Sequence, residues 1–298
     1  MSEKSTLQLE PSTLWSQLKA RTQSALAQGA LQSLPTDRTW IEDRGIRFLT
    51  RSLFNLQRKE KARKQQTGNP FLPYEEALFV TNISETHLCL LNKYNVVDRH
   101  LLMITRAFES QENWLNINDF EAMWACLAGV EGLAFYNGGA IAGASQPHKH
   151  LQLIPLVSEE TVYSLPIAPA IAQIQWDTEI ATIPVFNFPH AIAKFDFSWQ
   201  DSLTEAATAT LALYRRLLHH LGIEIQGENA TQAYNLLATR QWLLIVPRSR
   251  ADYAGIPVNS LGFAGALLVK SSQQLAYLKA LGPLNLLEKV AVNNKLCN

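Results

Sequence analysis

Apolar and polar residues alternate over positions 148–154, which is the strongest strand signal in the chain. The segment ends at Pro155, which cannot donate a hydrogen bond to a central sheet ladder. In a strand, a period of two places His148, His150 and Gln152 on one face and the neighbouring leucines on the other. We therefore predict a strand whose polar face carries two imidazoles and a carboxamide and whose apolar face points into a core.

Short apolar runs bounded by turn residues predict further strands, and four of them form two hairpins. The two hairpins resemble each other weakly in sequence, as two copies of a half-barrel would. The predicted strands occupy residues 46–49, 87–91, 100–105, 133–137, 233–238 and 242–246.

Apolar residues at helical spacing predict amphipathic helices. The first covers residues 12–28, the second begins at Asn118 or Asp119, and the third begins at a capping box that opens with Ser202. A final helix is expected to begin at Ser271.

Residues 157–197 contain spaced prolines and no helical period, so we interpret them as an irregular connection. Hairpins on both sides of this connection, together with the helices, predict an α+β fold. Its sheet is expected to be antiparallel, with helices on its faces.

The composition is that of a soluble globular chain with no dominant charge. Of 298 residues, 47% are hydrophobic and 17% are charged, and 26 Lys and Arg balance 26 Asp and Glu. A chain of zero net charge has no long-range field that favours nucleic acid or an anionic membrane. If the substrate is a polyphosphate, positive charge must therefore be concentrated at the site.

The cysteines and the N-terminus indicate a cytoplasmic protein. Cys89, Cys126 and Cys297 are odd in number and widely spaced, which favours free thiols in a reducing compartment. The first residues lack the apolar run of a signal peptide, and no stretch of about 18 apolar residues could span a bilayer.

The spacing of His148, His150 and Gln152 suits attack on a phosphorus atom. Histidine has a reference pKa of about 6.5, so a neutral ring nitrogen is available as a nucleophile near pH 7. A nearby carboxamide can donate to phosphoryl oxygens without titrating. The same spacing fits a metal-ligand pair or a solvated polar face equally well, so the motif alone leaves three interpretations open.

A glycine-rich segment precedes the histidines but is not a P-loop. Residues 138–145 read GGAIAGAS and lack the Gly-Lys-Ser/Thr ending that cradles phosphates in that motif. Glycine still allows a backbone to approach a ligand closely.

Several segments together resemble one family. The chain contains AFYNGG at 134–139, GASQPHKHLQLIP at 143–155, LLNKYNVVDRHLLMIT at 90–105 and VNSLGFAGALLVK at 258–270. These are similar to motifs of the diadenosine tetraphosphate (Ap4A) phosphorylases, or ATP adenylyltransferases. That family belongs to the histidine-triad superfamily, on the branch of galactose-1-phosphate uridylyltransferase, where HxHxQ replaces the HxHxH of the hydrolases. Leu261 departs from the commoner methionine.

The resemblance covers about residues 40–290 and implies a histidine-triad-like fold, with a duplicated half-barrel as one form of it. It divides the chain into an N-terminal Ap4A phosphorylase domain at 1–165, with the HxHxQ motif, and a C-terminal ATP adenylyltransferase domain at 185–290.

The resemblance also implies a mechanism with a covalent adenylyl-histidine. His150 attacks the α-phosphorus of Ap4A, ATP departs, and inorganic phosphate then takes the AMP to give ADP, in a reversible reaction. His148 orients His150, while Gln152 and Ser145 hold phosphoryl oxygens. The other residues that the resemblance places at the substrate are Lys59, Asn92, Lys93, Asn137, Gly143, Ala144, Gln146, Asn259, Ser260, Leu261 and Lys270.

Other functions of the superfamily stay open at this point. They are hexose-1-phosphate nucleotidyl transfer, dinucleoside polyphosphate hydrolysis, and binding of Ap4A without turnover. The first often uses zinc-binding Cys/His clusters, and the sequence contains no such spacing. We expect a monomer that binds Ap4A, ATP, ADP and phosphate, without nucleic acid, membrane or a tightly bound cofactor, and with any Mg²⁺ on the substrate phosphates.

Overall fold

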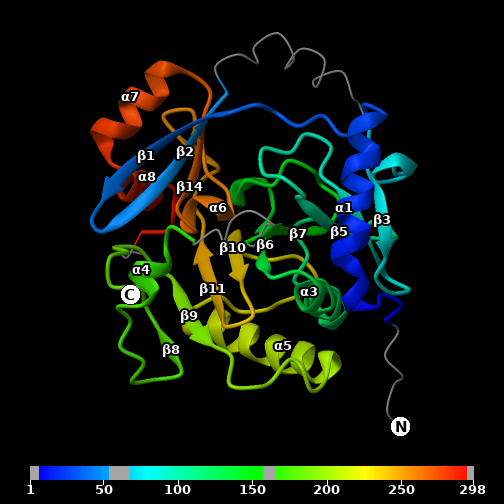
Figure 1. Ribbon diagram of the computed structural model, residues 1–298. Helices are drawn as coiled ribbons and strands as arrows, with labels where there is room; N and C mark the ends of the chain where they lie inside the picture. Colours follow the sequence, from blue (N-terminus) through cyan, green and yellow to red (C-terminus); the bar gives the residue numbers. More distant parts are fainter. Residues whose placement is uncertain (1–6, 54–67, 157–164, 294–298) are drawn as a thin grey trace.

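The computed structural model describes residues 7–53, 68–156 and 165–293. Its centre is a nine-stranded antiparallel sheet that runs through the whole molecule (Figure 1). In spatial order its strands are β3 (Phe79–Asn82), β4 (His87–Leu91), β5 (Leu101–Thr105), β7 (His150–Pro155), β6 (Gly132–Gly138), β10 (Tyr234–Ala238), β11 (Trp242–Pro247), β9 (Ala191–Lys194) and β8 (Ile180–Ala181). The predicted α+β class and antiparallel sheet are confirmed.

Eight of the nine strands form two halves with the same topology, and β3 pairs with β4 at the outer edge of the first half. In chain order, β4, β5, helix α3 (Ile117–Gly129), β6 and β7 are followed by β8, β9, helix α5 (Leu203–His220), β10 and β11. In space, the first half has the strand order β4-β5-β7-β6, and the second half has the corresponding order β8-β9-β11-β10. The halves join where β6 pairs with β10. The hairpin of β10 and β11 therefore corresponds to β6 and β7, and not to β4 and β5 as the sequence comparison suggested.

The helix boundaries follow their caps. Helix α1 (Pro11–Ala27) matches its prediction within a residue, and Ser202 caps α5 by accepting from the backbone N–H of Glu205. Helix α3 is capped by Asn116, so the predicted start at Asn118 or Asp119 is wrong. Asp119 is instead the third helical residue and completes a capping box with Asn116.

The C-terminal region adds two helices where one was predicted. Ser271 caps α7 (Ser272–Leu281) as expected, and α8 (Pro283–Val290) follows it directly. Both lie beside a small three-stranded sheet made of β1 (Asp37–Asp43), β2 (Ile46–Ser52) and β14 (Ala266–Val269) (Figure 1).

The segment 157–197, predicted to be an irregular connection, is irregular only in part over the residues that the structure describes from 165 onward, because the second half of the sheet begins within it. It contains one short helix, α4 (Ala168–Ile171), and the strands β8 and β9, which the sequence pattern did not indicate. His190 accepts from the backbone N–H of Ile183 and donates through Nδ1 to the carbonyl of Phe188. It is therefore a satisfied core histidine.

Two apolar layers cover the sheet unequally. One face packs against α1, α3 and α5 along its length, and Leu151 and Leu153 lie in that core, as predicted. On the other face, β2, β14, α7, α8 and the connection cover mainly the second half. The corresponding face of β4, β5 and β7 has only a small cluster around Leu90 and Leu102. No helix of the described residues covers that surface, and a ligand can reach the sheet there.

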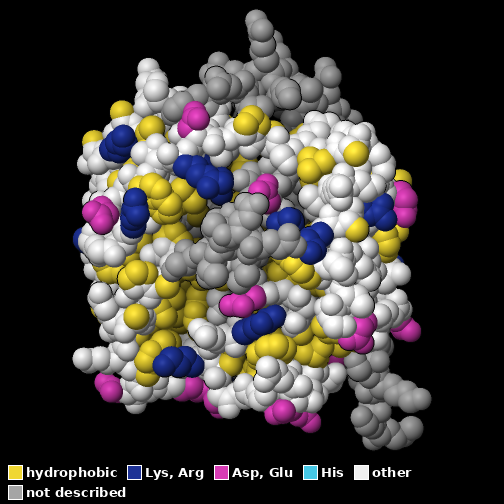
Figure 2. All heavy atoms as spheres, viewed as in Figure 1, with side chains coloured by type: hydrophobic (Ala, Val, Ile, Leu, Met, Phe, Trp, Pro, Cys, Tyr) yellow, Lys and Arg dark blue, Asp and Glu magenta, His cyan; other side chains and the backbone are white. Residues whose placement is uncertain are grey.

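Charged side chains are mixed on the surface. Figure 2 shows Lys and Arg interspersed with Asp and Glu on the visible face, in agreement with the formal net charge of zero. None of the helices in the described part of the chain is long and apolar enough to cross a membrane.

Candidate active site

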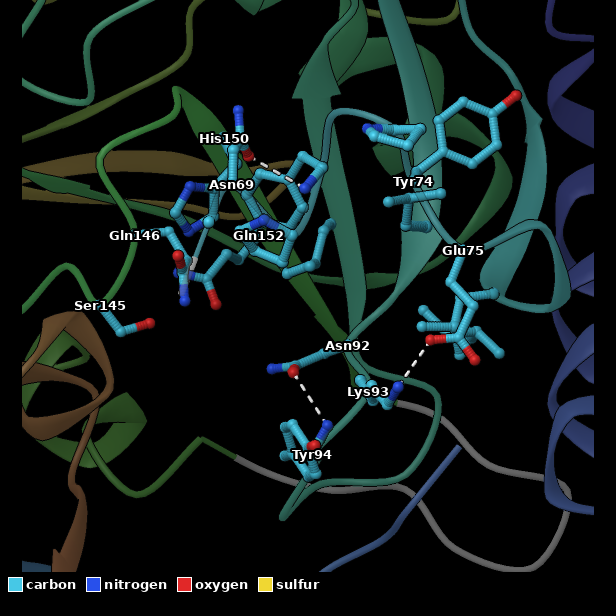
Figure 3. A pocket seen from close by; sticks show the side chains of 18 of the residues that line it. Asn69, Tyr74, Glu75, Asn92, Lys93, Tyr94, Ser145, Gln146, His150 and Gln152 are labelled. Carbon is cyan, nitrogen blue, oxygen red and sulfur yellow. Dashed lines mark hydrogen bonds and ion pairs between the residues drawn. The ribbon is translucent and has the colours of Figure 1, made fainter. Parts of the chain in front are cut away.

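A cavity of about 680 Å³ lies over the uncovered face of the first half (Figure 3). The motif strand supplies His150 and Gln152, the glycine segment supplies Ser145 and Gln146, and the link after β4 supplies Asn92 and Lys93. Lys270 reaches it from the end of β14. Seven of the predicted substrate and catalytic residues thus come together from four separate segments.

His150 has one nitrogen committed to the backbone and the other available. Its Nδ1 lies 2.8 Å from the carbonyl oxygen of His148, and a carbonyl can only accept, so Nδ1 carries the proton. The lone pair is therefore on Nε2, on a ring that lines the cavity. Phe71 packs edge-on against the ring, with 5.3 Å between centroids. This is the tautomer that a nucleophile attacking through Nε2 requires.

Burial keeps the His150 ring neutral. Loss of solvent disfavours the imidazolium and lowers the pKa of His150 to about 4, although the hydrogen bond to the His148 carbonyl acts in the opposite direction. The ring is therefore neutral near pH 7, with its proton on Nδ1 and a lone pair on Nε2 that can attack.

His148 is not on the cavity lining, although its ring packs against Phe71, as the His150 ring does. Regular pairing begins at His150, and His148 forms only an isolated bridge with Ser110. Its Nε2–H donates to the carbonyl of Thr105 at 2.8 Å, and its Nδ1 accepts from Asn69 at 2.9 Å. The His148 ring thus anchors the loop that carries Phe71, while its backbone carbonyl holds His150.

Gln111 is a residue at this site that the sequence analysis missed. Strands β6 and β7 stop pairing after Phe135 and Gln152, and the Gln111 carboxamide fills the gap. It accepts from the N–H of His150 at 2.8 Å and donates to the carbonyls of His150 and Asn137 at 3.2 and 2.9 Å. No local pattern marks this residue, because its partners are 26 and 39 residues away.

The charged groups on the described cavity lining are two lysines and one glutamate. Lys93 lies 2.6 Å from Glu75, and both are partly exposed (Figure 3). The formal charge of this lining is therefore only +1. Lys59, which was predicted to contact the substrate, lies outside the described residues.

Gly143 and Ala144, which were predicted to contact the substrate, are not on the cavity lining. Gly143 has φ +91°, and an added Cβ would be 2.6 Å from the carbonyl oxygen of Val258. Glycine is thus required here so that the segment can pack against the loop 258–265. Ala144 donates its N–H to the carbonyl of Gly139 and does not line the cavity.

Asn137 and Ser260 belong to a buried network and do not line the cavity. The Asn137 Oδ1 accepts from the N–H and hydroxyl of Ser260 and from Asn235, at 2.7–2.9 Å. Arg248, which is fully buried, donates to Asn235 and to the backbone of Val258. This network joins the two halves behind the site, so these residues support the site from outside the cavity.

Asn259 and Leu261 also lie outside the cavity lining. The side chain of Asn259 accepts from the N–H of Leu261 and caps the short helix α6 (Ser260–Phe263). The described residues include no group of three His, Cys, Asp or Glu side chains that could hold a metal ion.

The cavity on this histidine-triad-like sheet holds a neutral histidine whose Nε2 has no partner among the described residues, together with a carboxamide and two lysines. These groups define a nucleotidyltransferase class of site. A family model of the Ap4A phosphorylase N-terminal domain matches residues 4–173, and one of the ATP adenylyltransferase C-terminal domain matches residues 184–293. The chain belongs to the Ap4A phosphorylase family, which is a family of ATP adenylyltransferase enzymes.

Similar proteins are found in Saccharomyces cerevisiae. The chain is 29% identical over 238 residues to diadenosine 5',5'''-P1,P4-tetraphosphate phosphorylase 2, with 70% of each chain covered. It is 24% identical over 285 residues to Protein APA1, with 88% of each covered. The crystal structure of yeast Ap4A phosphorylase Apa2 in complex with Ap4A has a TM-score of 0.77 at 22% identity, covering 95% of this chain and 98% of the other. This likeness confirms the fold.

Proposed function

We propose that this chain cleaves Ap4A with inorganic phosphate to give ATP and ADP, through a covalent adenylyl group on His150. The observation that carries the proposal is the position of the His150 ring, which has its proton on Nδ1 and lines the same cavity as Gln152 and Lys270. The family assignment and the relatives named as Ap4A phosphorylases support the choice of substrate.

The reaction takes place in two displacements at one phosphorus atom. His150 Nε2 attacks the α-phosphorus, forming a P–N bond while the bond to the bridging oxygen breaks and ATP leaves. An oxygen of inorganic phosphate then attacks the same phosphorus, the P–N bond breaks, and ADP leaves. Because each displacement inverts the configuration, the product retains the configuration of the substrate.

The side chains around His150 have distinct tasks in this proposal. Gln152 and Ser145 donate to the phosphoryl oxygens, and such donors contribute about 10²–10³ in rate. Lys93 and Lys270 attract the polyphosphate. The formal charge of +1 on the described lining is small for such an anion. We therefore propose that Mg²⁺ on the substrate phosphates, or the basic run at 58–64, supplies the remaining charge.

Further properties of the protein are part of the same proposal. We place the enzyme in the cytoplasm as a monomer that acts on small nucleotides and not on nucleic acid. The segment 1–165 holds the HxHxQ site, and 185–290 forms the second part of the chain. Cell fractionation tests the cytoplasmic location, and sedimentation tests the monomeric state.

Intact-protein mass spectrometry tests the covalent step. Without phosphate, Ap4A is expected to add one adenylyl group to the wild-type chain and none to His150→Gln, and phosphate is expected to remove it with release of ADP. Equal turnover with and without phosphate would indicate a hydrolase. Binding of Ap4A with no turnover would indicate a nucleotide-binding protein without catalysis.

A further inference from the structure

Three polar residues form a row across β4, β5 and β7 on the cavity face of the sheet. Asn92 follows β4 and donates its backbone N–H to the carbonyl of His100, directly before β5, at 2.9 Å. Leu102 is paired with Gln152 across β5 and β7. His100 is therefore a diagonal neighbour of Gln152, within reach of its side chain.

The backbone N–H of Tyr94 determines which side-chain group donates and which accepts in each hydrogen bond of this row. The N–H of Tyr94 can only donate, and its partner is Asn92 Oδ1 at 3.3 Å. The Asn92 NH₂ group therefore points to His100 Nδ1, at 3.2 Å. Because an NH₂ group can only donate, Nδ1 of His100 is the acceptor and carries no proton.

The second ring nitrogen of His100, Nε2, then determines the orientation of the Gln152 carboxamide. Burial lowers the pKa of His100 to about 4, so the ring is neutral near pH 7 and its single proton is on Nε2. This Nε2–H lies 3.0 Å from Gln152 Oε1, which accepts. The NH₂ group of Gln152 is left with no acceptor among the described residues, and the side chain lines the cavity. A flipped carboxamide would instead turn an oxygen toward a phosphoryl oxygen and repel it.

We propose that His100 is a positioning residue that holds the Gln152 carboxamide with its NH₂ group toward the α-phosphoryl oxygens, and that Asn92 fixes the tautomer of His100 for this purpose. The inference rests on the proposed function for the identity of the anion. His100 itself is 7% exposed and does not line the cavity, so it acts through Gln152.

The ¹⁵N spectra of the imidazole rings test the tautomer in the ligand-free enzyme. His100 is expected to show a protonated Nε2 and an unprotonated Nδ1 near pH 7. His190 is an internal control of opposite type, because its Nδ1 donates to a carbonyl and its Nε2 accepts from a backbone N–H. A His100 ring protonated on Nδ1, or on both nitrogens, would overturn the proposal. This result does not depend on turnover, so it is separate from the outcome for the proposed function.

A double-mutant cycle tests whether His100 acts through Gln152. His100→Phe removes the donor while keeping a ring, and we expect kcat/KM for Ap4A to fall about 10- to 100-fold. In a Gln152→Ala background the same change is expected to cost less than about threefold. His100→Gln, which keeps a donor near the Nε2 position, should restore part of the activity. An equal loss in both backgrounds would show a general structural role and refute the inference.

Asn92→Asp provides a second variant of nearly unchanged shape. The carboxylate can only accept, so it draws the His100 proton to Nδ1 and turns Gln152 over. The readout of this variant is the changed tautomer in the spectra, because the added carboxylate lies on the cavity lining and lowers activity by repelling the polyphosphate as well. His190→Phe is the matched control for loss of a buried imidazole, and its kcat/KM should match the wild type. A wild-type tautomer in Asn92→Asp would contradict the proposed order of hydrogen bonds.

Discussion

The Nδ1 atom of His150 donates to the main-chain oxygen of His148, two residues earlier, at 2.8 Å. The proton position of the proposed nucleophile is therefore fixed by backbone, and the ring of His148 is not needed for it. That ring is used elsewhere, between Thr105 and Asn69.

This arrangement predicts different results for the two histidines. His148→Phe keeps the carbonyl and the aromatic contact with Phe71, so we expect kcat to fall only about tenfold, through loosening of the loop. His150→Gln removes the nucleophile and should lower kcat by about 10⁴-fold or more. Steady-state kinetics on both variants measure this difference. Equal losses would mean that the His148 ring acts directly in the reaction.

The lowered pKa of His150 predicts an unusual acid limb. Since burial disfavours the charged ring, His150 stays neutral as the pH falls from 7 to about 5 and becomes protonated only near its pKa of about 4. Below that pKa, kcat/KM should fall tenfold per pH unit. The adenylylation step with Ap4A, measured without phosphate, avoids titration of the acceptor. A fall that begins near pH 6.5 would show that the free enzyme leaves His150 solvated.

Gln111 is expected to be important for both stability and rate. Gln111→Leu leaves the N–H and carbonyl of His150 without partners, which should reduce the free energy of unfolding by about 1–3 kcal/mol and lower kcat about tenfold. Thr210→Val, which removes a buried hydrogen bond to Trp124 on the opposite face, is the control. It should lower stability alone. Unchanged kcat in Gln111→Leu would show that the strand holds His150 without this carboxamide.

Alanine substitutions at Gly143 and Gly222 distinguish a steric clash of the added Cβ from the strain of a positive φ. Both have positive φ, but a Cβ on Gly143 would meet the Val258 carbonyl, whereas nothing lies within 4 Å of a Cβ on Gly222. Gly222→Ala should cost about 1 kcal/mol of unfolding free energy, and Gly143→Ala about 2–3 kcal/mol with a raised KM. Thermal melts and steady-state kinetics measure these effects. Equal destabilisation would mean that the loop 258–265 moves aside freely.

Because Glu75 and Lys93 form an ion pair on the cavity lining, neutralising one or the other should have opposite effects on the affinity for Ap4A. Removing the Glu75 carboxylate in Glu75→Gln frees Lys93 and takes away a repulsive charge, so we expect Kd for Ap4A to decrease about two- to fivefold. Lys93→Gln should increase it about three- to tenfold and weaken its salt dependence. Glu179→Gln, in an exposed pair with Arg216, is the control and should leave Kd unchanged. Weaker binding in Glu75→Gln would assign the carboxylate a direct role in binding.

The sequence predicts well what depends on local periodicity. The alternation after His148 placed Leu151 in the core and His150 and Gln152 on the opposite face, as the structure has them. It did not show that the regular strand begins only at His150, because His148 forms its bridge with Ser110, a residue from a distant segment. The start of α3 was also missed, although Asn116 and Asp119, three residues apart, form a capping box, which is a local signal.

Long-range contacts explain the other differences. Asn137 and Ser260 were predicted to contact substrate, but they bond to each other across 123 residues of sequence. The partners of Gln111 and the row from Asn92 to Gln152 likewise depend on strand register, which no single segment reveals. The predicted roles of the residues that do line the cavity stay predictions until the variants are measured.

The pairing of β6 with β10 has a consequence for any attempt to divide the chain. The pairs from Tyr234 with Gly138 to Ala238 with Ala134 are the seam that makes one sheet of two repeats. A cut in the connection near residue 175 would expose a bare strand edge on each fragment, a surface prone to aggregation. Separately expressed fragments should therefore be insoluble, whereas co-expressed fragments should restore the seam and complement each other.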